Sequence, residues 1–138
     1  MSRPVWVLDT NVVVSAALTA GGTCDQVLRA AIENDVRLAW SAGMLAEYRA
    51  VLLRPKFGFS KPVIAALLAA FAESEQVRTL QPAPELPDRD DEVFLATALA
   101  TTDKILVTGN DTHFPVDRCL PVKILSPRAA LESIGLGE

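Results

Sequence analysis

The chain has 138 residues, of which 50% are hydrophobic and 22% are charged, and its formal net charge at pH 7 is −4. This length fits one domain over residues 1–138, with a core that needs neither disulfides nor metal for its stability. The negative charge excludes a protein that holds nucleic acid by bulk positive potential alone. No apolar run is long enough to cross a membrane and no signal peptide is visible, so we expect a cytoplasmic protein without a membrane partner.

Strand and helix patterns alternate from the N-terminus onward. Residues 5–8 predict a short strand, and a helix over residues 12–18 follows the polar residues that begin with Asp9. Thr23 is expected to cap the next helix, after which residues 36–40 return to strand character.

The middle of the chain carries two further helices and a short strand. Ser41 is expected to cap a helix that ends before Pro55, and residues 62–72 predict the next helix. Residues 76–80 are a candidate edge strand. The run over residues 93–100 is apolar all around a helix, so we expect that helix to be well buried.

The C-terminal part returns to strands before a closing helix. Residues 104–108 and 122–125 predict strands, and Ser126 with Pro127 marks the start of the last helix. Strands that alternate with helices in this way predict an α/β fold, in which helices cover a parallel sheet.

Polar side chains follow three of the predicted strands. Asp9 and Ser41 come directly after the first two strands, and Asn110 with Asp111 follows a later one. Because ligands of parallel sheets collect beyond the carboxyl ends of the strands, we expect these exits to share one rim. For Asp9, a role as a helix cap alone is the competing interpretation.

Acidic residues elsewhere in the chain are candidates for the same rim. Glu47 follows the helical face of Met44 and Val51, at the edge of the core, where a salt bridge is the alternative to a site carboxylate. Asp88, Asp90, Asp91 and Glu92 precede the buried helix, and a close pair of like charges costs about 1 kcal/mol even in water, which favours a bound cation. A solvated charged surface is the alternative for this cluster.

His113 is the only histidine, and it stands in a turn where we expect a structural hydrogen bond rather than nucleophilic catalysis. A phosphatase of the haloacid dehalogenase type needs an acid at position 11, and Asn11 argues against it.

Four blocks, in this order along the chain, together resemble the PIN-domain ribonucleases, most closely the toxin component of bacterial toxin–antitoxin pairs. The blocks are residues 7–12, residues 41–57, residues 88–96 and residues 106–115. The resemblance implies a three-layer sandwich, with a central, mainly parallel sheet flanked by helices. It also implies that the acidic metal-site positions are Asp9, Glu47 and Asp91, with Asn110 as the fourth position and Asp111 as its substitute.

Further residues match supporting positions of that family. The resemblance implies that Thr10, Asn11, Ser41 and Thr108 support the acidic pocket, as capping or hydrogen-bonding groups. It also makes Arg49, Arg54 and Lys56 candidate phosphate contacts on a stretch without acidic residues, with solubilising surface charge as the alternative.

Carboxylate oxygens without clustered His or Cys suit Mg²⁺ or Mn²⁺, and the number of ions stays open. The resemblance implies a metal-dependent endoribonuclease that leaves 5′-phosphate and 3′-hydroxyl ends, with RNA as substrate, an antitoxin protein as partner and a homodimer as assembly. The alternative is a non-catalytic module that binds RNA or protein with the same fold.

Overall fold

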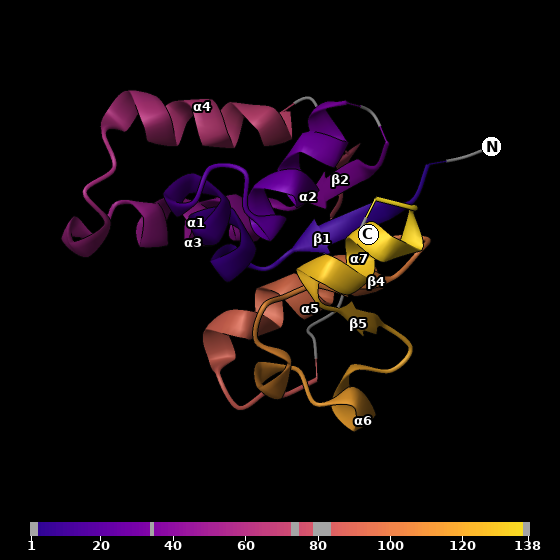
Figure 1. The fold of residues 1–138 in the computed structure, drawn as a ribbon. Helices are drawn as coiled ribbons and strands as arrows, with labels where there is room; N and C mark the ends of the chain where they lie inside the picture. The colour runs from indigo at the N-terminus through magenta and orange to yellow at the C-terminus, as the bar shows by residue number, and fades with distance from the viewer. Residues whose placement is uncertain (1–2, 34, 73–74, 79–83, 137–138) are drawn as a thin grey trace.

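The computed structural model describes residues 3–33, 35–72, 75–78 and 84–136, in which five strands form one sheet in the order β3-β2-β1-β4-β5 (Figure 1). Every pairing between neighbouring strands is parallel. The predicted α/β class with a parallel sheet is therefore confirmed. The strands are β1 (Val5–Leu8), β2 (Arg37–Trp40), β3 (Glu75–Gln76), β4 (Ile105–Val107) and β5 (Lys123–Leu125).

Seven α-helices and three short 3₁₀ helices connect and flank these strands in the described part of the chain (Figure 1). None of the described helices is both long enough and apolar enough to span a membrane. The α-helices are α1 (Thr10–Leu18), α2 (Thr23–Ile32), α3 (Ala42–Leu52), α4 (Lys61–Ala72), α5 (Glu92–Leu99), α6 (Val116–Cys119) and α7 (Pro127–Ser133), and the 3₁₀ helices are η1 (Pro55–Phe57), η2 (Arg89–Asp91) and η3 (Asp111–His113).

Two predicted helix starts need correction. The first helix begins at Thr10 rather than at residue 12, because the Asp9 carboxylate accepts a hydrogen bond from the Thr10 backbone N–H and caps the helix there. The second helix is capped by Gly22, so the predicted capping role of Thr23 is wrong. The predicted caps at Ser41 and Ser126 are confirmed, since each side chain accepts a backbone N–H of its helix.

The edge strand is shorter than predicted. β3 occupies two residues, so the strand predicted over residues 76–80 is wrong at Val77 and Arg78, and residues 79 and 80 lie outside the described residues. The Val77 N–H still bonds to the Trp40 carbonyl at 2.8 Å, but β2 ends at Trp40 because Ser41 caps the next helix. The edge strand therefore ends where its partner does.

Helix α5 is the buried helix predicted from its apolar circumference. None of its residues is exposed, and it packs across β1, β2 and β4. Its polar residue Thr97 is satisfied internally, because its hydroxyl donates to the Val93 carbonyl at 2.7 Å and lies 2.8 Å from Ser41 Oγ. Helices α3 and α5 approach each other closely at Gly43, since a Cβ at this position of α3 would lie 2.8 Å from a Val93 methyl of α5.

The order of the strands locates the functional edge of the sheet. The chain runs from the central β1 to β2 and β3, then returns to the other side of β1 as β4. The direction of winding therefore reverses between β1 and β4. In open parallel sheets, ligands bind outside the carboxyl ends of the strands at such a reversal.

Candidate metal centre

A cleft of about 290 Å³ lies beyond the carboxyl end of β1, at this reversal point, and several carboxylates line it. We call it the acidic cleft. The sequence places its acids far apart, directly after β1, in α3 and in the segment around η2, and the fold brings them together. They are Asp9, Glu47, Asp88, Asp90 and Asp91, with His113 beside them.

Asp9 is the most firmly held of these acids. Its backbone N–H bonds to the Val107 carbonyl at 2.9 Å, which continues the pairing of β1 with β4. Its Oδ1 accepts from the Thr10 N–H at 2.8 Å and its Oδ2 from the Thr108 hydroxyl at 2.8 Å. Burial raises the pKa of Asp9, and these two hydrogen bonds oppose that rise. Asp9 is therefore both a helix cap and a residue of the cleft.

The Thr108 hydroxyl is itself positioned by the loop that follows β4. Its oxygen accepts from the Asn110 backbone N–H at 3.1 Å and lies 3.5 Å from Asn11 Nδ2. Asn11 Oδ1 in turn accepts from the Gly109 N–H at 3.1 Å. Asn11 and Thr108 thus join the exits of β1 and β4 and orient the Asp9 carboxylate, which gives a physical basis for the supporting role expected of them.

Glu47 is brought to the cleft by its neighbour on α3. The ring of Tyr48 is fully buried, and its hydroxyl donates a hydrogen bond to the Leu8 carbonyl. This bond holds α3 next to the end of β1. Glu47 is half-buried, and burial followed by the charge of Asp90 raises its pKa, while Arg54 opposes the rise. No ion pair in the described part of the chain involves Glu47, so the salt-bridge interpretation finds no support there.

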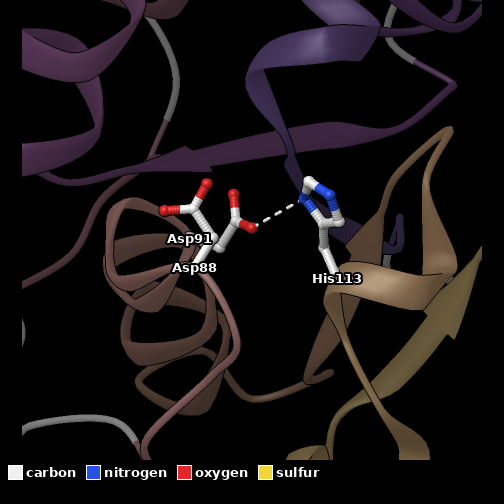
Figure 2. A group of neighbouring side chains, drawn as sticks. All are labelled: Asp88, Asp91 and His113. Carbon is white, nitrogen blue, oxygen red and sulfur yellow. Dashed lines mark ion pairs between the residues drawn. The ribbon is translucent and has the colours of Figure 1, made fainter.

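Asp88, Asp91 and His113 form the tightest group of candidate metal ligands in the described residues. One ligand atom from each lies within 4.8 Å of the others, and Figure 2 shows the Asp91 carboxylate directed at the imidazole, with the Asp88 carboxylate on its other side. Asp91 Oδ2 is 2.9 Å from His113 Nδ1. Burial and the charge of Asp9 raise the pKa of Asp91 to about 6, and His113 opposes this rise.

The structure distinguishes the four acids of the run from Asp88 to Glu92, among which helical periodicity could not choose and of which the resemblance named Asp91. The Glu92 carboxylate accepts a hydrogen bond from the Leu86 backbone N–H at 3.0 Å, so it binds the backbone rather than facing the cleft. Asp88 caps η2 by accepting the Asp90 N–H at 2.9 Å, and it still lines the cleft. Asp91 is buried with 9% of its surface exposed, whereas Asp88 and Asp90 are exposed.

His113 and Asp88 are site residues that sequence reasoning missed. We expected His113 to make a structural hydrogen bond in its turn, but its ring lines the acidic cleft and contacts Asp91. Asp88 was recognised as part of the acidic run and not as a ligand. No motif spacing joins the two segments, so contact between them is a tertiary property.

Six residues predicted for the site do not line the acidic cleft. Ser41 caps α3 by accepting the Met44 N–H, and Asn110 Oδ1 accepts from the Thr112 hydroxyl at 2.7 Å. Asp111 is exposed at the start of η3. Thr108 acts on the cleft through its hydrogen bond to Asp9. The six are Ser41, Arg49, Lys56, Thr108, Asn110 and Asp111.

The polar atoms of the cleft fit a divalent cation. Thr10 Oγ1 is buried and has no hydrogen-bond partner among the described residues, and the only partner of Asp91 Oδ2 there is His113 Nδ1; both residues line the cleft. Buried polar atoms are normally satisfied, so unpaired ones at a site call for a ligand. Carboxylate oxygens suit Mg²⁺ or Mn²⁺, and the carboxylates outnumber the single imidazole in this cleft.

Comparison with protein-family models gives a match to the PIN domain over residues 5–112. The chain belongs to the PIN domain family. PIN domains are generally metal-dependent nucleases and typically use divalent metals. The matched region of this PIN domain contains all five acids of the cleft and ends just before His113. Comparisons with curated proteins and with solved structures find no match.

Proposed function

We propose that this PIN domain is an endoribonuclease that uses Mg²⁺ or Mn²⁺ to hydrolyse RNA phosphodiester bonds. The observation that carries the proposal is the convergence of Asp9, Glu47 and Asp91 on one cleft at the reversal point of the sheet. The pKa of each of the three is raised. Burial, followed by the charges of neighbouring acids, disfavours their charged form unless a cation compensates it.

The residues of the cleft have separable tasks in this proposal. Asp9, held by Thr10 and Thr108, presents a carboxylate of fixed orientation, and Asp91 with Asp88 presents a second one. When bound, the cation supplies positive charge for the phosphate and lowers the pKa of a water molecule. The products expected from the family resemblance carry 5′-phosphate and 3′-hydroxyl ends.

Cationic residues beside the cleft are proposed to hold the RNA backbone. Arg54 lines the cleft, and its charge opposes the rise in the pKa of Glu47, so the two side chains interact electrostatically. Arg49 and Lys56 are exposed on the same stretch of chain, outside the cleft lining, and are proposed contacts to flanking phosphates. A local basic strip suits a protein whose net charge is negative.

The decisive experiment is a cleavage assay with matched variants. Purified protein is incubated with a mixed RNA substrate and Mn²⁺ or Mg²⁺, with and without a chelator. We expect cleavage that the chelator abolishes and that Asp91→Asn abolishes as well. Asp117→Asn makes the same chemical change on exposed α6, outside the cleft, and is expected to cut normally.

Other outcomes lead to different conclusions. RNA retention without cleavage, unaffected by chelation and by Asp91→Asn, would favour a non-catalytic binding module. Cleavage that survives both treatments would point to a contaminating nuclease and contradict the proposal.

We further propose that the enzyme is the cytoplasmic toxin of a toxin–antitoxin pair, acts as a homodimer and is inhibited by an antitoxin protein. The support is the order of the four sequence blocks and membership of the PIN family. Induced expression should arrest bacterial growth, and Asp91→Asn should relieve the arrest. Growth arrest that persists in this variant would contradict a role of RNA cleavage in toxicity.

A further inference from the structure

The acidic cleft has an apolar wall that cation binding does not use. Besides the carboxylates, the apolar residues Val14, Val51, Phe57 and Phe94 line it, and we call these four the apolar wall. Its volume of about 290 Å³ far exceeds that of a cation and approaches the ~300–1,000 Å³ of pockets for small organic ligands. The apolar wall therefore has room for a flat organic group beside the carboxylates.

Phe57 is the aromatic residue of this wall with an accessible ring. It is half-buried at the end of η1, whereas Phe94 is 1% exposed in the core. The Phe57 ring is stacked on Phe59, with 5.7 Å between ring centroids and 17° between planes. Gly58 adopts a left-handed backbone with φ of 66°, which favours glycine and turns the chain between the two rings.

Positive charge surrounds this aromatic pair. Lys56 Nζ lies 5.1 Å from the centroid of the Phe57 ring, and Arg54 lines the cleft beside Phe57. Aromatic rings flanked by Arg or Lys are the combination by which proteins hold single-stranded nucleic acid, since bases stack on the rings and phosphates pair with the cations. A carboxylate–metal site alone requires neither group.

We propose that Phe57, backed by Phe59, is a stacking subsite for one unpaired RNA base next to the scissile phosphate, whose backbone Arg54 holds. This inference rests on the proposed endoribonuclease activity and deepens it by assigning the residue that contacts a substrate base. Phe57 and Phe59 also pack against the hydrophobic core, so a test must separate stacking on RNA from a structural role.

The test removes the base and the ring separately. After the cut site has been mapped, single-turnover cleavage is measured on single-stranded oligoribonucleotides that carry one abasic nucleotide, moved position by position along the strand. For the wild-type protein we expect an abasic nucleotide at one position beside the cut to slow cleavage roughly 10-fold or more. Phe57→Leu should slow cleavage of intact RNA similarly and lose this extra sensitivity, whereas Phe57→Tyr should keep it.

A second measurement uses the wild-type protein and so does not depend on the folding of a variant. An oligoribonucleotide with 5-iodouracil at the sensitive position is crosslinked by light, and the modified peptide is identified by mass spectrometry. Attachment at Phe57 or Phe59 supports the subsite, and attachment elsewhere overturns it. Equal abasic sensitivity in Phe57→Leu and wild type would also overturn it, while the nuclease activity would stand. If the wild-type protein cuts no RNA with any divalent cation, both proposals fail.

Discussion

The strand side of the acidic cleft, formed by Asp9 and Asn11, is hydrogen-bonded to Thr108 and Gly109 behind it, and Asp9 is only 4% exposed. The helical side, formed by Glu47 and Arg54, is more open. Neither of these two side chains makes a hydrogen bond within the described part of the chain. The two sides therefore differ in how firmly they hold their charged groups.

This difference suggests a division of labour in the proposed enzyme. A ligand carboxylate needs a fixed direction, and hydrogen bonds to the exits of β1 and β4 provide it. Groups that contact a flexible RNA strand can adjust when it binds, because open side chains reorient at little cost. Substitutions on the strand side should therefore affect the cation and the chemistry, and those on the helical side should mainly affect RNA binding.

The largest expected effect comes from comparing Asp9→Asn with Glu47→Gln. Asp9→Asn removes the hydrogen-bonded carboxylate and should reduce single-turnover RNA cleavage roughly 100- to 1,000-fold. Glu47→Gln removes the more open carboxylate and should reduce cleavage less. Asp9→Asn should also raise the Tm of the metal-free protein, because it removes a buried charge whose ionisation burial disfavours. Equal losses of activity would remove the proposed distinction between the two sides.

Thr108→Val tests the hydrogen bonds of the strand side directly. When the Thr108 hydroxyl is removed, the Asp9 carboxylate loses one of its two hydrogen bonds, and Mn²⁺ affinity should fall roughly 10- to 100-fold. Isothermal titration calorimetry measures this change. Thr108→Ser keeps the hydroxyl and should bind Mn²⁺ nearly as the wild type does. If both variants bind equally well, the hydroxyl does not orient the ligand.

The raised pKa of Asp91 predicts a pH dependence of stability and of metal binding. Its value is 3.8 in a model peptide and about 6 in the fold, so its stabilising contribution is complete below pH 3.8 and disappears as pH rises through 6. Cation binding requires the ionised form, so Mn²⁺ affinity should fall toward ~10-fold per pH unit below 6.

Thermal melts between pH 4 and 8, with and without Mn²⁺, measure both effects. Relative to wild type, metal-free Asp91→Asn should gain stability as the pH rises from 4 to 6, and the difference should stay constant at higher pH, where Asp91 is ionised in both states. Parallel curves for the two proteins would contradict a raised pKa at this residue.

Arg54→Ala and Arg49→Ala compare a cation inside the cleft with one outside its lining. Arg54→Ala should raise KM for RNA several-fold and reduce the salt dependence of binding, since about one phosphate contact is lost. Arg49→Ala should have a smaller effect, and kcat should change little in either variant. Steady-state cleavage at several salt concentrations gives all three quantities. A larger effect from Arg49 would move the RNA path away from the cleft.

The smallest effect is expected at the position that the family resemblance left open. Asp111 is exposed and outside the cleft lining, so Asp111→Asn should leave cleavage and Mn²⁺ affinity unchanged. Asn110→Ala removes the acceptor for the Thr112 hydroxyl and should act weakly, through the loop that carries Thr108. A strong loss of metal binding in Asp111→Asn would restore it as a ligand.

Local patterns in the sequence were sufficient for much of the fold. Ser41 and Ser126 predicted helix starts because a cap depends on a few neighbouring residues, and the all-apolar run of α5 predicted a helix buried on every side. Residues without a local signal were missed or misjudged. The Gly22 cap and the early end of β3 depend on neighbouring segments.

The sequence by itself determined that the acids Asp9, Glu47 and the run from Asp88 to Glu92 stand at the ends of strands and the starts of helices. The resemblance named Asp9, Glu47 and Asp91, but only the tertiary structure brings them to one cleft, because α5 is apolar on all sides and its periodicity cannot select Asp91 over its neighbours. His113 and Phe57 end the short 3₁₀ helices η3 and η1, whose positions are set by long-range packing rather than by a repeating pattern.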